Sequence, residues 1–450
     1  MNPTCRLRPV TALLGLAGSV LAAGCGNVAD VRERFRGETP RETYEHALGV
    51  AGLTETALGR DWLAAAGRAL AEPHPIRLPY REAGYLPPEQ PTAIGYLLTA
   101  RRGQQITVEL ELHADSAALV FIEVYRLLDD SARTLRLVAA ADSVARRTEF
   151  EAQRDGSYVV RIQPELLRGG RYALTISAAG SLAFPVEGAS ARSIASGFGA
   201  PRDGGRREHH GVDIIAPRGT PVLAAISGYV RRVRETPRGG KVVWLSDGER
   251  RQSLYYAHLD SQLVREGMWV QAGDTIGLVG NTGNARTTPP HLHFGIYRRG
   301  EGPVDPYWFL FRPDPPTARL NVDTTVLGRW TRAARDGIRL RAAPAEDAPA
   351  RAELPRHTAM RVLAATGSWY RVRLPDGTVG FVAGRLLEQA DDAVASERVA
   401  TTLALRSVPL PGAIVVDSIA PGAEVPVLGR FGAYLFVQAP GGRTGWVELN

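Results

Sequence analysis

Five of the nine histidines in this 450-residue chain lie between residues 209 and 293, and this clustering constrains how that part of the chain can fold. They fall in three segments, HHGVD (209–213), YAHL (256–259) and HLHF (291–294). Residues i and i+2 of a strand point to the same face of a sheet, so HLHF in a strand directs both imidazoles the same way. A fold that brings the three segments together can therefore hold a metal ion.

The residue types in this cluster are those of an open zinc site. Histidine supplies the commonest neutral nitrogen ligand for zinc, and an Asp four residues after a His supplies an oxygen ligand. In HLHF, one imidazole can bind the metal while the other reaches the space beside it. Such an arrangement is typical of a catalytic zinc site with bases to spare, and not of a closed structural site.

The positive charge of the chain does not indicate nucleic-acid binding. The formal net charge is +7, but Lys241 is the only lysine, and the arginines are interspersed with Asp and Glu. No basic stripe interleaved with aromatic residues is present. We therefore expect no nucleic-acid partner.

The N-terminal residues predict export. Arg6 and Arg8 precede an apolar stretch, residues 10–23, that is too short to span a bilayer and is typical of a signal peptide. Small residues directly before Cys25 resemble a bacterial lipobox. Residues 1–25 are therefore expected to be a lipoprotein signal peptide with Cys25 as the lipidation site.

A lipid on Cys25 would anchor the protein to a membrane, because each buried methylene of an acyl chain contributes about 0.8 kcal/mol. Gly26 follows the cysteine, which in a two-membrane bacterium favours the periplasmic side of the outer membrane. The expected location is thus the cell envelope. Ordinary secretion with a free Cys25 is the alternative.

Two further regions precede the histidine cluster. Residues 26–88 are expected to form a helical N-terminal region, because apolar residues recur at helical spacing through about Ala71. Its two histidines, His46 and His74, are expected on the surface. Residues 89–182 change to a period of two, which predicts a β-sandwich. The expected strands read ITVELELH, ALVFIEVYRL, TLRLVAAA, GSYVVRIQ and RYALTISA.

The C-terminal part contains a repeat after a proline-containing linker, residues 313–330. A shift of 65 residues maps the first copy, residues 331–390, onto the second, residues 396–450, without gaps. Each copy has the order LR-x-x-P, an aromatic strand, a PDG or PGG turn and G-[FW]-V. This order resembles bacterial SH3-like domains, which are small barrels often attached to cell-wall enzymes. The whole chain is therefore expected to be mainly β and multidomain.

Four segments, HHGVDIIAPRGTPVLAAISGYV, YAHL, GMWVQAGDTIGLVGNTG and PHLHF, occur in one order within residues 190–312. Together they resemble the lysostaphin/LytM-type zinc peptidases, which cut peptide bridges in peptidoglycan. The resemblance implies that residues 190–312 form a β-rich peptidase domain. It covers about a quarter of the chain.

The resemblance also implies the roles of the histidines. His209, Asp213 and His293 match the zinc ligands, with His210 as the alternative to His209. His258 and His291 match the catalytic pair. Three protein ligands leave a fourth position for water, whose pKa zinc lowers toward about 7. His291 is then expected to be the general base, with His258 stabilising the oxyanion or assisting proton transfer, although these two roles could be exchanged.

The predicted function is therefore that of an exported zinc metalloendopeptidase, a hydrolase of peptide cross-links in the peptidoglycan of the cell wall. The first alternative is a non-catalytic envelope regulator that activates another cell-wall hydrolase. A scaffold lipoprotein is disfavoured, because it gives no reason for the full histidine set. A protein or glycine-rich peptide as substrate would keep the same chemistry. The bond that is cut and the oligomeric state are left open by the sequence.

Overall fold

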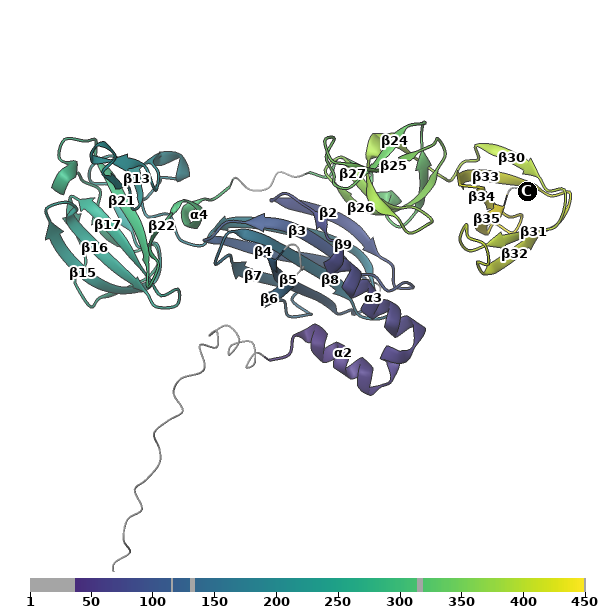
Figure 1. The fold of residues 1–450 in the computed structure, drawn as a ribbon, viewed down its shortest axis with the longest axis horizontal. Helices are drawn as coiled ribbons and strands as arrows, with labels where there is room; N and C mark the ends of the chain where they lie inside the picture. The colour runs from purple at the N-terminus through teal and green to yellow at the C-terminus, as the bar shows by residue number, and fades with distance from the viewer. Residues whose placement is uncertain (1–36, 115, 130–133, 314–318, 449–450) are drawn as a thin grey trace, which may run out of the picture.

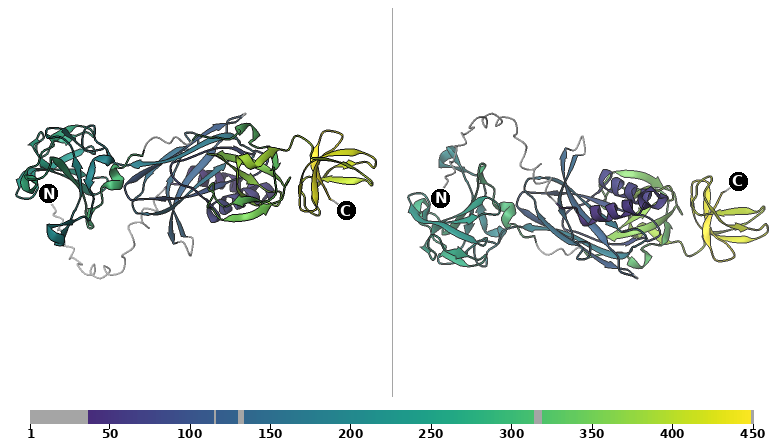
Figure 2. Two further views of the ribbon diagram at one scale, coloured as in Figure 1. Left: turned by 90° about the horizontal axis from the view of Figure 1, so that it is seen from above. Right: turned by 90° about the horizontal axis from the view of Figure 1, so that it is seen from below.

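The computed structural model describes residues 37–114, 116–129, 134–313 and 319–448, so the predicted signal peptide and Cys25 lie outside the described residues. The described chain is mainly β, which confirms the predicted fold class (Figure 1). A histidine-bearing domain, a central sandwich with a first small β module, and a second β module follow one another along the molecule (Figure 2). No described helix is both long and apolar enough to cross a membrane.

Two helices, α2 (Pro40–Val50) and α3 (Ala57–Ala71), begin the described chain. A capping box starts α2: Thr39 Oγ1 accepts from the Glu42 backbone N–H at 3.2 Å, and Glu42 Oε2 accepts from the Thr39 N–H at 2.7 Å. α3 ends at Ala71, where the helical spacing of the sequence ends. The helices pack against the sandwich through the buried indole of Trp62.

The sandwich is built from two sheets whose inward side chains form one core. The first sheet has the order β1 (His74–Pro75), β3 (Ile94–Ala100), β8 (Gly156–Pro164), β5 (Val120–Asp129) and β6 (Thr134–Ala140). The second has the order β2 (Tyr80–Leu86), β9 (Gly170–Gly180), β4 (Gln104–His113) and β7 (Arg147–Glu151).

The alternating pattern identifies β4, β5, β6, β8 and β9, but the expected strands do not include β1, β3 or β7. They also miss β2, which lies inside the range expected to be helical. The prediction of a helical region up to residue 88 is wrong for Tyr80–Leu86. Along β2 every second residue is buried, but two of the buried positions are Glu82 and Gly84. A charged residue and a glycine on the inward face conceal the period of two that marks a strand.

The histidine-bearing domain is a β structure around one large core. Its main sheet has the order β10 (Ile194–Ser196), β13 (Val212–Ile215), β21 (His291–Arg298), β17 (Gln252–Leu259), β16 (Gly240–Asp247), β15 (Gly228–Thr236) and β19 (Trp269–Val270), with β22 (Gly302–Val304) beside β21. The smaller elements are β14 (Pro221–Leu223), β20 (Thr275–Leu278), β18 (Ser261–Gln262), the pair β11 (Pro201–Arg202) and β12 (Arg207–Glu208), and helix α4 (Tyr307–Leu310).

Two small β modules follow. The first contains β23 (Trp330–Ala333), β24 (Ile338–Arg341), β25 (Ala350–Leu354), β26 (Ala359–Thr366), β27 (Trp369–Arg373), β28 (Val379–Ala383) and β29 (Leu387–Gln389). The second contains β30 (Ala395–Arg398), β31 (Leu403–Arg406), β32 (Val415–Ile419), β33 (Glu424–Phe431), β34 (Tyr434–Gln438) and β35 (Thr444–Glu448).

Strand pairing in the two modules repeats at the offset seen in the sequence. Arg341 pairs with Phe381 in the first module, and Arg406 pairs with Trp446 in the second. The register shifts within β26 and β33 also fall at equivalent positions. The first module begins earlier than expected, because Val326, inside the predicted linker, is buried in its core.

The first module and the sandwich share one continuous sheet, since β2 pairs with β26 through Ala83↔Ala365. Behind this pairing, the guanidinium of Arg371 lies 3.0 Å from Glu82 Oε1, and both side chains are buried. Glu82 also accepts hydrogen bonds from the buried hydroxyls of Tyr80, Tyr96 and Tyr172. A buried ion pair surrounded by tyrosine hydroxyls therefore joins the module to the sandwich, with Arg371 Nε left without a hydrogen-bond partner among the described residues.

Candidate metal centre

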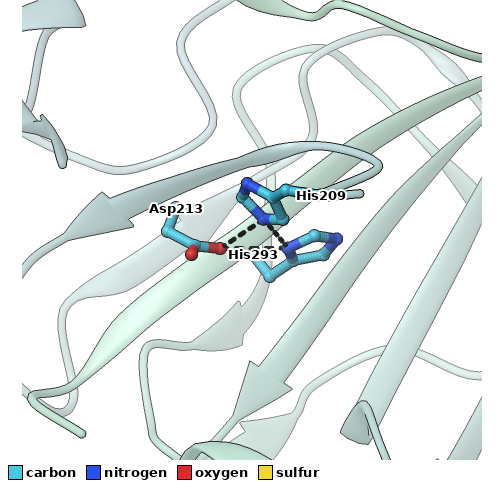
Figure 3. A group of neighbouring side chains, drawn as sticks. All are labelled: His209, Asp213 and His293. Carbon is cyan, nitrogen blue, oxygen red and sulfur yellow. Dashed lines mark hydrogen bonds and ion pairs between the residues drawn. The ribbon is translucent and has the colours of Figure 1, made fainter. Parts of the chain in front are cut away.

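The antiparallel pairing of β13 with β21 brings two of the predicted ligands together. Asp213 lies opposite His293 in this register, and His209 precedes β13. Figure 3 shows the three side chains pointing toward one another. His209 Nε2 lies 3.0 Å from Asp213 Oδ1 and 2.9 Å from His293 Nδ1, and His293 Nδ1 lies 3.0 Å from Asp213 Oδ1.

This triangle of ligand atoms fits a zinc ion. A tetrahedral shell with bonds of about 2.0–2.1 Å places its ligand atoms roughly 3.3 Å apart, close to the separations in this structure. Two imidazole nitrogens and a carboxylate oxygen are also a donor set that zinc accepts. Among the described residues, His209, Asp213 and His293 are the group whose ligand atoms converge in this way.

Hydrogen bonds outside the triangle orient the ligands. His209 Nδ1 lies 2.8 Å from the carbonyl oxygen of Gly197, which leaves Nε2 for the metal. Arg202 donates to Asp213 Oδ2 at 2.6 Å and to Ser196 Oγ at 2.7 Å, so only Oδ1 of Asp213 faces the two histidines.

The surroundings keep Asp213 ionised. Burial alone would raise the pKa of this carboxyl group, but the hydrogen bonds and charges of His209 and His293 outweigh that effect and hold the pKa well below its usual range. A carboxylate that stays deprotonated is what a metal ligand requires.

The two remaining histidines of the cluster lie beside the triangle. The ring centroids of His258 and His291 are 5.0 Å apart, and His291 Nε2 lies 3.9 Å from Asp213 Oδ1. Nδ1 of each ring is 2.9 Å from a backbone carbonyl oxygen, that of Thr282 for His258 and that of Pro289 for His291. These contacts favour the Nδ1–H tautomer, which leaves Nε2 of both rings as a proton acceptor.

The backbone at His258 is in the left-handed region, with φ of 64°. Regular alternation along β17 would place His258 on the face opposite Tyr255 and Ala257. All three residues nevertheless line the same cleft. The unusual φ therefore turns the imidazole toward the site, a local strain of the kind found at functional positions. Burial, followed by the charges of His291 and His293, lowers the pKa of His258 to about 4.

The structure separates His210 from this group. His210 is exposed and stacks on Phe198 with the ring centroids 6.5 Å apart. Of the two adjacent histidines, His209 is thus the one that faces Asp213 and His293.

His74, expected on the surface, has a buried Nδ1 instead.

The triangle lies in a cleft of about 670 Å³. One wall is aromatic: Trp244 packs on Tyr255 and Tyr297, with centroids 4.5 and 5.2 Å away. Neither this wall nor Arg202 is among the residues predicted from the sequence. The period of two along β17 could have placed Tyr255 on the face of Ala257, which pairs with His293. No local pattern could have identified Arg202, because its contact with Asp213 depends on the β11–β12 hairpin.

Comparison with known proteins assigns two parts of the chain to families. Residues 207–306 match Peptidase family M23, and residues 336–388 match the Bacterial SH3 domain family. The chain thus contains an M23 peptidase domain and one bacterial SH3 domain. The SH3-like nature of the second module stays a prediction.

Several relatives carry names that specify an activity, and two of them illustrate the range. "Peptidoglycan DD-endopeptidase ShyB" of Vibrio cholerae is 36% identical over 156 residues, which cover 32% of this chain and 34% of the relative. "L-Ala--D-Glu endopeptidase" of Bacillus subtilis is 36% identical over 139 residues, covering 28% of this chain and 42% of the relative. The chain thus spans less than half the length of either. Among solved structures, the catalytic domain of lysostaphin from Staphylococcus simulans is 32% identical, with a TM-score of 0.24, and covers 27% of this chain and 94% of that domain.

Proposed function

We propose that this protein is an exported zinc endopeptidase that hydrolyses peptide cross-links of peptidoglycan. The observation that carries the proposal is the convergence of His209, Asp213 and His293 beside two further histidines whose Nε2 atoms are free to accept protons. This arrangement lies inside the M23 match, and the relatives named above are peptidoglycan endopeptidases.

The five side chains would divide the chemistry as follows. His209 Nε2, Asp213 Oδ1 and His293 Nδ1 would hold the metal, with Arg202 keeping the second carboxylate oxygen away from it. When bound there, zinc would polarise the scissile carbonyl group and lower the pKa of a water molecule. His291 Nε2 would accept the proton of the attacking water.

His258 would then act on the other side of the reacting carbonyl. Its lowered pKa keeps the ring neutral at neutral pH, and in that form its Nε2 accepts a proton or a hydrogen bond. Once it has taken up the second proton of the attacking water, it would stabilise the oxyanion or protonate the leaving amine. The aromatic wall beside it would position the peptide and exclude water from the reacting bond.

The bond that is cut must be determined by experiment, because the two relatives are named for different bonds. Purified sacculi would be digested by the chain from Asn27 onward, with and without a chelator, beside His291→Ala. The muropeptides would be identified by mass spectrometry. Metal-dependent loss of cross-linked dimers that His291→Ala abolishes would establish the endopeptidase and identify its bond.

The opposite result would favour the alternative function. If a preparation with one zinc ion per chain left every dimer intact, the protein would be the non-catalytic regulator of another hydrolase. That regulator would have no need for His258 and His291 with free Nε2 atoms, which is why the enzyme is preferred.

The proposal includes lipid anchoring at Cys25. The motif before Cys25 and the wall substrate named for the relatives both suit a protein held in the cell envelope. Labelling of cells with a radioactive fatty acid would test this: the label should enter the wild-type protein and be absent from Cys25→Ser. Equal labelling of both proteins would refute the anchor.

A further inference from the structure

A second cleft, of about 550 Å³, opens where α3, the segment before β3 and the first β module meet. We call it the junction cleft. None of its lining residues lines the peptidase cleft. Arg68 comes from α3, Gln90 from the segment before β3, and Arg351 and Arg373 from β25 and β27 of the module. The cleft therefore exists only when helix, sandwich and module are assembled.

The junction cleft carries an excess of positive charge. Arg68, Arg351 and Arg373 line it, and Glu72 is its one carboxylate side chain. Within the described residues, none of these three arginines forms an ion pair. Two of them donate hydrogen bonds to neutral groups: Arg373 to Gln90 Oε1 at 2.9 Å, and Arg351 to the carbonyl oxygen of Val379 at 2.8 Å. Their guanidinium groups thus have donors left for an anion.

His74, in the wall of the cleft, experiences the positive charge of the nearby arginines. Its ring packs edge-on against Phe381 at 5.8 Å, and its buried Nδ1 has no hydrogen-bond partner among the described residues. Burial, and then the charges of Arg371 and Arg351, lower the pKa of His74 to about 3. Burial and the neighbouring arginines likewise lower the pKa of Arg373. The cations therefore repel one another, and the single carboxylate that lines the cleft, Glu72, leaves them in excess.

We propose that the junction cleft binds the carboxylate groups of an acidic peptide. Guanidinium groups match carboxylates in shape and charge, and a volume of about 550 Å³ accommodates a short peptide rather than a single small ion. The choice of peptide rests on the proposed function: one relative is named for the L-Ala–D-Glu bond, and a wall peptide that contains glutamate carries a carboxylate. The junction cleft would hold an uncut wall peptide while the peptidase domain acts on a cross-link elsewhere.

Binding would be measured by calorimetry on His291→Ala, which keeps the wall fragments intact. The probes are a soluble disaccharide tripeptide with free carboxylates, the same fragment with its carboxylates amidated, and inorganic phosphate. We expect Arg68→Gln/Arg351→Gln to weaken binding of the first probe by roughly 10-fold or more, since charge-assisted hydrogen bonds are lost. Both arginines are exposed, so thermal unfolding should show an unchanged fold. Arg335→Gln, an exposed arginine of the same module outside the cleft, should bind as His291→Ala does.

Several outcomes would overturn the proposal. Equal affinity for the free and amidated fragments would show that carboxylates are not recognised. Tighter binding of inorganic phosphate would assign the cleft to a different anion. If wild-type protein cut sacculi but the double arginine variant bound the tripeptide normally, the junction cleft would be refuted and the endopeptidase retained. If sacculi stayed intact while binding depended on the arginines, the endopeptidase would be refuted and the carboxylate site retained.

Discussion

At the scale of single residues, the geometry of the candidate metal centre depends on how Asp213 is held. Its two oxygens have different partners, with Oδ1 toward His209 and His293 and Oδ2 toward Arg202. A carboxylate held in this way would bind a metal through one oxygen. Arg202 is thus a positioning residue for a proposed ligand. Its loss should therefore reduce the metal affinity more than it reduces the stability of the fold.

We predict that Arg202→Gln weakens zinc affinity by about 10- to 100-fold, because Asp213 loses the partner that fixes its orientation. Competition with a fluorescent chelator measures the affinity directly. Arg206→Gln, an exposed change in the same hairpin region, serves as the control and should bind zinc normally. Unchanged affinity in Arg202→Gln would mean that the triangle is orientated without this arginine.

His74 should make stability depend on pH. Its pKa is lowered to about 3 in the folded protein, against about 6.5 when unfolded, so the unfolded state takes up the proton first. This group's contribution is therefore fully present above pH 6.5 and is lost as pH falls toward 3, by at most about 1.4 kcal/mol per pH unit. Because His74 is only partly buried as a residue, the observed slope should be smaller. His74→Leu should lose less stability than wild type between pH 7.5 and 5, as measured by urea unfolding; parallel curves would contradict the assignment.

At the scale of elements, the β15–β16 hairpin supports His258, one of the two proposed catalytic histidines. Its Gly240, with φ of 62°, packs directly against Thr282, whose carbonyl oxygen accepts from His258. A side chain at residue 240 would collide with Thr282 and move this acceptor. The hairpin thus acts on the site through a contact that leaves the metal ligands untouched.

Gly240→Ala should therefore lower kcat by at least roughly 10-fold while zinc content stays the same. Gly219→Ala is a matched control, because Gly219 also has a positive φ, 86°, but open space where its Cβ would lie. Activity on sacculi and bound zinc would be measured for both variants. Equal losses of activity would indicate that backbone strain alone, and not displacement of Thr282, is responsible.

At the scale of the whole molecule, the sandwich and the first module are expected to unfold as one body. They share a sheet through β2 and β26, and the buried pair of Glu82 and Arg371 lies at their junction. Removing one partner of such a pair leaves a buried charge without compensation. The junction cleft is built on the same contact.

Arg371→Met is expected to destabilise this body by about 3–5 kcal/mol. Adding Glu82→Gln should restore part of that stability, since a neutral amide oxygen can still accept from the surrounding tyrosine hydroxyls. Scanning calorimetry would follow both variants. If Arg371→Met lowered the transition of the module alone and left that of the sandwich in place, the two would be independent units.

The sequence by itself determined the repeat and the mainly β class, and it predicted the residues of the proposed ligand set. These features depend on local sequence patterns. HLHF places two imidazoles on one face of a strand, and HHGVD separates His209 from Asp213 by four residues. The repeat is visible as matching residues at an offset of 65. Regular alternation likewise identified β4 and β9, because their inward residues are nearly all apolar.

Only the tertiary structure decided the features that rest on contacts between distant segments. β2 carries Glu82 on its buried face, so its sequence does not predict a strand. The partner that allows this charge to be buried, Arg371, lies far along the chain. Arg202 acquires its role through a hairpin, and His258 faces the site through an unusual φ. The junction cleft needs three separate parts of the chain. In each case the feature depends on an interaction between side chains that are distant in the sequence. No local sequence pattern contains information about such an interaction.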